Sequence, residues 1–197
     1  MSANASAKLV GELRERTGAG LMDCKKALEE CGSDIEKAVI VLKKKGIASA
    51  DKKAQRQAAE GLVTSYIHTG GRIGVLLQLN CETDFVAKND QFIALAHDIC
   101  MHIAAFSPQY VCKEDVPAEV IAREKEIAES QVVGKPPNAV NAIVEGKLAK
   151  YCAGICLLEQ PFVKNPDISV GDLIKEHIAK IGENIRVVRF TRFQVGA

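Results

Sequence analysis

The chain has 197 residues, an apolar fraction of 47% and a formal net charge of +1. This length suits one large domain, or a small domain followed by a larger one. Acidic and basic residues are interleaved, which argues against a nucleic-acid surface built on bulk positive charge. No apolar run approaches the ~20 residues that a membrane-spanning helix requires. We therefore expect no direct contact with nucleic acid and none with a membrane.

The seven cysteines are odd in number, and no two of them form a Cys-x-x-Cys pair. A structural zinc site usually needs such closely paired ligands. Five of the thiols fall within helical patterns, where they act as small apolar residues, so we expect no metal site and no cofactor. Unpaired thiols indicate a reducing compartment, and the first seven residues lack the charge and apolar core of a signal peptide. These features predict a cytoplasmic protein.

Three short helices are predicted within residues 1–46. Two of them repeat apolar residues at i, i+3, i+4 and i+7, which gives each one apolar face. We expect the third helix to open with a capping box of Ser33 and Glu36 and to end at Gly46. A core of this size is marginally stable, and such modules usually serve as docking units.

The turn between the first two helices, Thr17–Asp23, combines glycines with the large apolar residues Leu21 and Met22. The two side chains either fill the bundle core beneath a tight turn or form an exposed docking knob, for which Met is well suited. The pattern leaves both readings open. The turn is not a phosphate-binding loop, because no Gly-Lys-Ser/Thr follows it.

Residues 47–60 are rich in helix formers but nearly lack large apolar residues, which predicts an exposed helical linker. Strand patterns begin at residue 61, and the alternation from Ile73 to Leu79 predicts the second strand of a hairpin. Residues 185–195 alternate imperfectly, which indicates an edge strand or a bulge. Together with several helices, these features predict an α+β core with a small antiparallel sheet over residues 61–197.

Several helices are expected in this second region, with a chain break at residues 134–138. One of them presents a narrow apolar face from Val140 to Ile155, which suits packing against a second helix from this chain or from another copy. Residues 160–166 are bounded by prolines and expected to be extended. Ser169 is expected to cap a last helix that ends at Gly182.

The stretch Asn80–Asn89 follows a strand and precedes a capped helix, and it sets Phe85 beside Asp84. It is either a plain connection or a presented functional tip. Cys81 is a poor nucleophile here, because neighbouring acids disfavour its thiolate. No nucleophile elbow, dinucleotide loop or zinc-protease motif is present. We therefore expect no catalytic residues and a protein that is not an enzyme.

Two long motifs, Thr17–Leu28 and Asn80–Asn89, resemble the two signatures of the bacterial translation elongation factor Ts family. The segments Gln160–Val163, Ile181–Ile185 and Arg189–Phe193 are similar to its C-terminal region. The resemblance covers essentially the whole chain. One departure is Leu21, where the family often has Met; the change conserves volume.

The resemblance implies a ubiquitin-associated-like three-helix bundle, a linker and an α+β core. It implies a guanine-nucleotide exchange factor for the GTPase elongation factor Tu. In the family, an Asp-Phe tip enters between two helices of the GTPase domain and disturbs the Mg²⁺ and phosphate site. That role falls on Asp84 and Phe85, flanked by Thr83 and Val86. N-terminal docking on the GTPase falls on three further residues: Leu21, Met22 and Lys25.

The chain is similar to the short form of the family, whose members are expected to work as homodimers. The apolar face from Val140 to Ile155 and the C-terminal strand are the candidate contacts. The N-terminal bundle by itself would also fit a different class of function. In that alternative, the chain is a ubiquitin-associated-like adaptor that binds protein segments or ribosomes without exchange activity.

Overall fold

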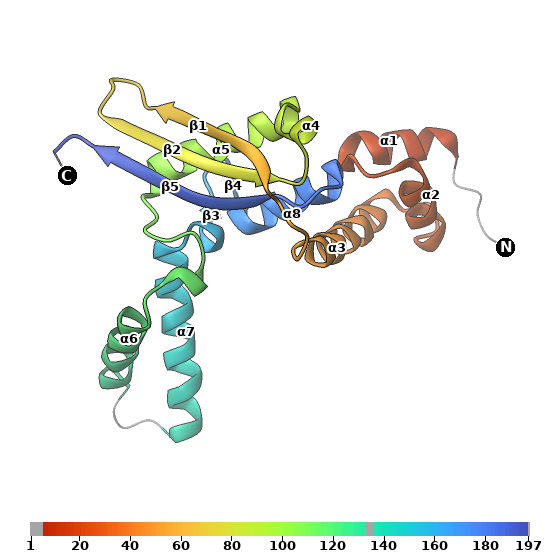
Figure 1. Cartoon of the computed structure of the whole chain (residues 1–197). Coiled ribbons are helices and arrows are strands. Elements are labelled where there is room, and N and C mark those ends of the chain that lie inside the picture. Colours follow the sequence, from red (N-terminus) through yellow and green to blue (C-terminus); the bar gives the residue numbers. More distant parts are fainter. Residues whose placement is uncertain (1–5, 133–135, 197) are drawn as a thin grey trace. The chain divides into compact units, whose positions relative to one another are not determined.

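The computed structural model describes residues 6–132 and 136–196. The first five residues lie outside the described residues, and so do residues 134 and 135 of the break expected at 134–138; a helix already begins at Pro137. The chain combines helices with a small sheet, so the predicted α+β class is confirmed (Figure 1). It divides into two compact units. The first contains Met1–Leu62, Asn80–Leu95 and Ile174–Arg186, and the second contains Val63–Leu79, Ala96–Leu173 and Val187–Ala197.

The predicted N-terminal bundle is present in the first unit, as α1 (Ala7–Thr17), α2 (Leu21–Glu30) and α3 (Ile35–Lys53). Gly18 ends α1 in the left-handed region, with φ of 67°, where a side chain would be strained. The core of the bundle consists of small and medium apolar residues drawn from all three helices: Val10, Leu13, Cys24, Ala27, Leu28, Ala38 and Leu42.

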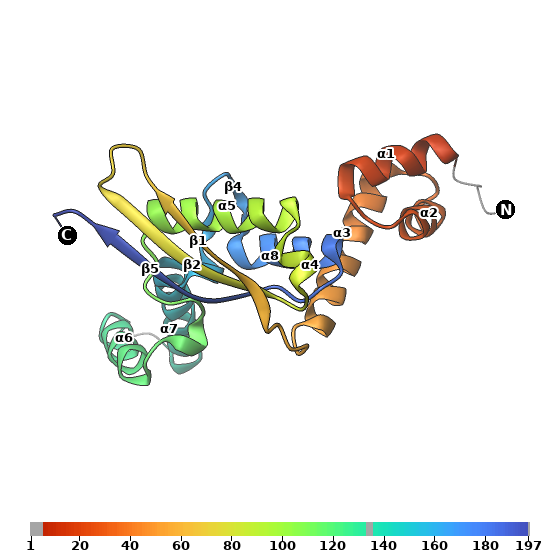
Figure 2. The same ribbon diagram turned by 45° about the horizontal axis from the view of Figure 1, so that its top comes forward.

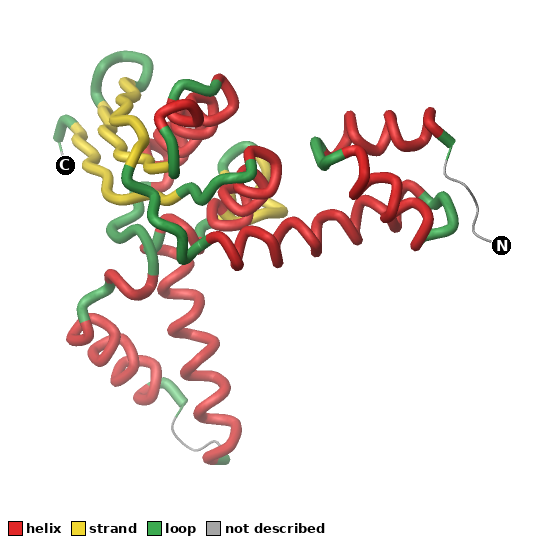
Figure 3. Tube along the Cα trace, turned by 45° about the vertical axis from the view of Figure 1, so that its right-hand side comes forward, coloured by secondary structure: helices red, strands yellow, loops and turns green. Residues whose placement is uncertain are grey.

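The third helix differs from its prediction at both ends. Its N-cap is Asp34, whose carboxylate accepts from the Lys37 N–H at 3.1 Å, so the capping box expected from Ser33 and Glu36 was wrong. Ser33 instead completes the turn after α2, with its N–H on the Leu28 carbonyl at 2.8 Å. The helix also continues through Gly46 to Lys53 as one unbroken element (Figure 3), so the expected end at Gly46 was wrong.

The reason for the longer α3 is tertiary. Ala50, one turn beyond Gly46, is buried, and a Cβ placed at Gly46 would lie only 3.2 Å from the Cβ of Ala179. The glycine therefore allows a close helix approach, while its backbone remains helical. The domain boundaries expected near residues 46 and 60 stay a prediction.

The main sheet has the strand order β1-β2-β5, formed by β1 (Glu60–Ile67), β2 (Ile73–Cys81) and β5 (Arg186–Gln194). The central strand β2 alternates as predicted, and its buried residues Val75, Leu77 and Leu79 point to one face. Helix α5 (Asp90–Phe106) runs beside the strands (Figure 2).

The last strand, β5, lies at an edge of the sheet, as predicted. Val187 is buried, and the Arg192 guanidinium donates to the Ala104 carbonyl of α5 at 3.1 Å. Residues an odd number apart point to opposite faces in a regular strand. Val187 and Arg192 both face inward, so the alternation is broken between them, which explains the irregular pattern in the sequence.

Helices α6 (Ala118–Ser130) and α7 (Pro137–Ile155) form a hairpin in the second unit (Figure 1). The apolar face of α7 packs against α6, with Val144 beside Ala128 and Val132. The partner of that narrow face is therefore a helix of the same chain. Of the two partners expected for the face from Val140 to Ile155, a helix of this chain or one of another copy, the structure shows the first.

Further elements are short 3-10 turns at Lys113–Asp115 and Leu157–Glu159, and α8 (Val170–Ile181). The strands β3 (Pro161–Phe162) and β4 (Asn165–Ser169) form a two-stranded antiparallel pair. The segment expected to be extended thus forms a small hairpin. Ser169 caps α8 as predicted: its hydroxyl oxygen accepts from the Asp172 N–H at 3.0 Å and donates to the Asp172 carboxylate at 2.9 Å.

His102 of α5 is fully buried in the second unit, beside the β3 hairpin. Its Nδ1 accepts from the Val163 N–H at 3.2 Å, which requires the proton to sit on Nε2, where it is donated to Gln160 Oε1 at 2.9 Å. The Gln160 amide donates to the Gly154 carbonyl at 2.8 Å, which fixes its orientation. Burial lowers the pKa of His102 below its ordinary 6.5, against an opposing effect of the Gln160 hydrogen bond.

We predict that His102 makes the fold sensitive to acid. Because its pKa is lower in the folded state, the unfolded chain binds more protons as the pH falls through 6.5, and stability decreases there. His102→Gln should lower the free energy of unfolding at pH 7.5 by ~1–3 kcal/mol and remove this component of the pH dependence. Urea unfolding at pH 7.5 and 5.5 measures both. An equal loss of stability in the two proteins across this interval would contradict the prediction.

Candidate functional site

The stretch Asn80–Asn89, predicted to be either a plain connection or a presented tip, contains one helical turn, α4 (Asp84–Ala87), between β2 and α5. Thr83 is its N-cap, and the Thr83 hydroxyl oxygen accepts from the Val86 N–H at 3.4 Å. The turn holds Phe85 outward, where it is 80% exposed, the highest value among the large apolar side chains of the described residues. A phenyl ring so placed on ordered backbone is typical of a contact surface.

A carboxylate from the far end of the chain supports this turn. Glu183, which follows α8, accepts from the N–H groups of Glu82 and Thr83 at 3.1 and 3.0 Å through one oxygen. Its other oxygen accepts from the Thr83 hydroxyl at 2.7 Å. In return, Glu82 accepts from the Asn184 N–H at 2.6 Å. Hydrogen bonds to ionised carboxylates are the stronger kind, so these two segments are tied together reciprocally.

The chain that follows α3 joins the same network. The buried Asn184 amide donates to the carbonyls of Ala54 and Arg56 at 3.3 and 2.8 Å, and the Asn80 amide donates to the Ala58 carbonyl at 2.9 Å. Three backbone segments thus meet at the base of α4 within the first unit. The position of α4 is therefore held by long-range hydrogen bonds in addition to the few within the turn itself.

The electrostatics of the tip keep Asp84 ionised. A hydrogen bond and ion pair with Lys88, at 2.8 Å, lower the pKa of Asp84 and raise that of Lys88. The tip therefore presents a carboxylate beside an apolar ring. Burial, and then the nearby Glu183 carboxylate, raise the pKa of Cys81 to about 11. Its thiol stays protonated at neutral pH and cannot serve as a nucleophile.

The second predicted surface, on the bundle, is also solvent-accessible. Leu21 and Met22 occupy the first two positions of α2 and are 55% and 61% exposed. The core positions of that helix belong to other residues, so the reading that places these two side chains in the bundle core is wrong. Lys25 is exposed one turn further along, 4.0 Å from the Glu29 carboxylate. Together these residues make an apolar surface with a cation beside it.

Among the residues that the structure describes, no cluster of three or more His, Cys, Asp or Glu side chains could hold a metal ion. No helix in the described part of the chain is long and apolar enough to cross a membrane. The sequence reasoning did not include Glu183 and Asn184, which support the α4 turn, in the candidate site. Two polar residues between the end of α8 and a buried Ile185 were the available signal, although nothing local identified their partners.

We predict that Glu183 is required to hold α4 in place. Glu183→Ala removes the acceptor of three hydrogen bonds, so the N–H groups of Glu82 and Thr83 lose their partner. The free energy of unfolding should fall by ~1–3 kcal/mol. The control is Glu126→Ala, an exposed carboxylate on α6. Urea unfolding compares the two variants, and equal midpoints would show that the network is not stabilising.

Known proteins resemble this chain over nearly its whole length. A family model described as elongation factor TS matches residues 49–197. Elongation factor Ts of Carboxydothermus hydrogenoformans is 60% identical over 193 residues, which cover 97% of this chain and 89% of the relative. Elongation factor Ts of Thermodesulfovibrio yellowstonii is 59% identical over 192 residues, 97% of this chain and 96% of the relative. That of Geobacter sulfurreducens is 58% identical over 193 residues, with 97% and 89% covered. The chain therefore belongs to the elongation factor Ts family.

Proposed function

We propose that this protein is a guanine-nucleotide exchange factor for elongation factor Tu and promotes GDP release during translation elongation. Membership of the elongation factor Ts family supplies the partner. The observation that carries the proposal is the exposed Asp84–Phe85 pair, presented on a turn that the Glu183 network holds in place.

The proposed mechanism depends on binding alone. Phe85 enters between two helices of the GTPase domain, and burial of its ring contributes about 1.5–3 kcal/mol to a complex in which those helices are separated. The Asp84 carboxylate enters with it and disfavours the nearby Mg²⁺ and phosphate arrangement. Because linkage is reciprocal, a factor that binds the nucleotide-free GTPase more tightly weakens nucleotide binding by the same ratio.

The support beneath the tip fits this role. A wedge on a flexible loop would lose conformational entropy on insertion and would bind weakly. Thr83 is held by Glu183 and caps the turn through Val86, so little ordering remains when the partner arrives. Leu21, Met22 and Lys25 form a second contact with the same GTPase in this proposal, since they are exposed and apolar with one cation.

We further propose that the protein is a homodimer formed through the outer face of the sheet in the second unit. One face of the sheet is buried, as Val75, Leu77 and Leu79 of β2 show. The opposite face carries exposed apolar side chains from all three strands: Val63, Ile67, Leu76 and Phe193. Identical faces pack against one another about a two-fold axis, as in sandwiches of two sheets. The α7 face is already covered by α6, which favours the C-terminal strand of the two candidate contacts.

The wedge is tested by Phe85→Ala. Loss of ring burial should slow factor-stimulated GDP release by roughly 10- to 100-fold, while thermal stability changes little because the ring is exposed. Release of a fluorescent GDP from elongation factor Tu measures the rate. Ile127→Ala, an exposed apolar residue on α6, is the control and should behave as wild type. Release as fast with Phe85→Ala as with wild type would refute the wedge. No acceleration by micromolar wild-type factor would favour the adaptor alternative.

The dimer is tested by Phe193→Lys, which places a charge in the apolar sheet face. Wild type should scatter light as a particle of twice the 21.2 kDa chain mass in reducing buffer, and the variant should shift towards one chain. Ile127→Lys, which adds the same charge on α6, should leave the mass unchanged. A wild-type particle of single-chain mass at micromolar concentration would contradict the proposal.

A further inference from the structure

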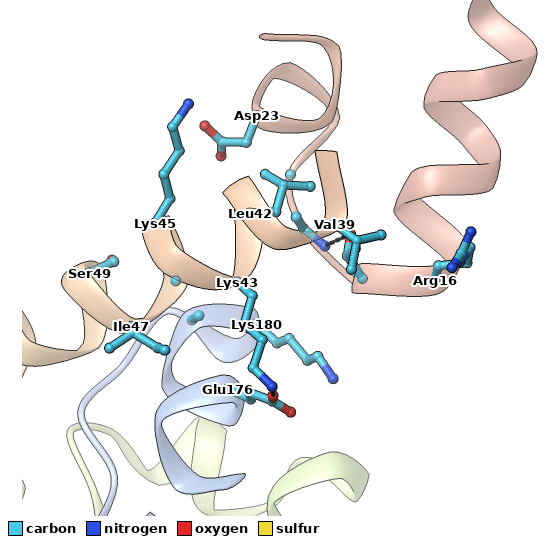
Figure 4. A pocket seen from close by; sticks show the side chains of 15 residues that line it. Arg16, Asp23, Val39, Leu42, Lys43, Lys45, Ile47, Ser49, Glu176 and Lys180 are labelled. Atoms are coloured by element: carbon cyan, nitrogen blue, oxygen red, sulfur yellow. Dashed lines mark hydrogen bonds and ion pairs between the residues drawn. The ribbon is translucent and has the colours of Figure 1, made fainter. Parts of the chain in front are cut away.

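Helix α8 contacts the second half of α3 at several points, all within the first unit (Figure 4). Lys43 and Glu176 form an ion pair at 3.3 Å, and Asp51 and Lys175 form another at 2.9 Å. Between these pairs the two helices come very close at Gly46, where a Cβ would lie 3.2 Å from the Cβ of Ala179. A Cβ at Gly46 would require Ala179 to move by a few tenths of an ångström, and a side chain as large as that of Leu would need more room.

The same segment also reaches both candidate contact surfaces. The aliphatic part of Lys180 lies against Gly18, at 3.3 Å from the position of a Cβ there, in the turn that leads to Leu21 and Met22. A few residues later, Glu183 and Asn184 hold the base of the α4 turn and the chain that leaves α3. One continuous stretch of chain therefore touches the bundle at one end and supports the tip at the other.

The junction is made of discrete contacts, because it is not packed throughout. A cavity of about 360 Å³ opens between α3, α8 and the α1–α2 turn, with apolar walls from Val39, Leu42 and Ile47 (Figure 4). Its rim carries Lys43 and Lys180. Beside this cavity, the contacts that join α3 to α8 are the two ion pairs and the close approach at Gly46.

We propose that the α8 face from Lys175 to Lys180 is a clasp that positions the Leu21–Met22 surface relative to the Asp84–Phe85 tip, with Gly46 as its main positioning residue. The inference rests on the proposed exchange activity. A rigid connection lets two modest surfaces bind one partner together, since the second contact forms at a high effective concentration. With a loose junction, the effective concentration of the second contact would fall, although neither surface would be altered.

Gly46→Leu tests the clasp, with Gly11→Leu as the matched control. Both glycines lie within helices, but a Cβ at Gly11 meets no atom within 4 Å. In a titration of factor against fluorescent-GDP release, Gly46→Leu should raise the half-saturating factor concentration about tenfold and leave the maximal rate within twofold, because the tip is intact. Gly11→Leu should change neither. An unchanged half-saturating concentration, or a fall in the maximal rate alone, would overturn the positioning role.

Charge reversal offers a test without steric strain. Lys43→Glu should raise the half-saturating concentration, and the double variant Lys43→Glu with Glu176→Lys should restore it, because the ion pair is re-formed in the opposite sense. Failure of the second change to restore binding would count against the ion pair as part of the clasp.

Hydrogen exchange in the free protein separates failure of the clasp from failure of the proposed function. Amides of residues 47–54 should exchange about tenfold faster in Gly46→Leu than in Gly11→Leu, while those of residues 84–95 stay unchanged. Unchanged exchange at 47–54 would overturn the clasp even if wild type stimulates GDP release. If wild type fails to stimulate release, the exchange function is wrong and the positioning role falls with it.

Discussion

The Glu183 carboxylate is the contact on which the candidate site depends. It accepts three hydrogen bonds from Glu82 and Thr83, a hundred residues earlier in the chain, and so joins the end of α8 to the start of α4. A single helical turn has too few internal hydrogen bonds to be stable alone. The turn that carries Phe85 therefore takes its order from this long-range acceptor, and from Asn184, which ties the end of α3 to the same point.

This arrangement fits the proposed exchange mechanism, which depends on binding. Its exposed features include an aromatic ring with a neighbouring carboxylate, a Leu-Met pair at a helix start and an apolar sheet face. The Cys81 thiol, the nearest reactive group to the tip, is kept protonated by burial and by Glu183. The same carboxylate that orders the tip thus suppresses thiolate formation beside it. In the proposed mechanism, exchange arises from the difference in affinity between two states of the partner.

Gly46 shows how a correct local rule can mislead. Glycine commonly ends helices, since it adopts positive φ without strain, and the sequence pattern predicted an end there. In the folded chain Gly46 is helical, and its lack of a side chain is used for contact with Ala179. Ser33 is a similar case: it resembled a helix cap, but the turn after α2 required its backbone at φ of 68°, so Asp34 became the cap.

By itself the sequence determined the α+β class, the bundle helices, the alternation of β2, the Ser169 cap and the two stretches that contain the candidate contact residues. The elements and the cap follow from periodicity and capping, which act over a few neighbouring residues. The two stretches stood out by their large apolar residues at turns and by their resemblance to the family's signatures. Only the tertiary structure decided that Leu21 and Met22 are exposed, that α7 packs on α6, and that Glu183 holds Thr83. The physical reason is that a hydrogen bond or a close helix approach between distant segments leaves no periodic signal in either segment.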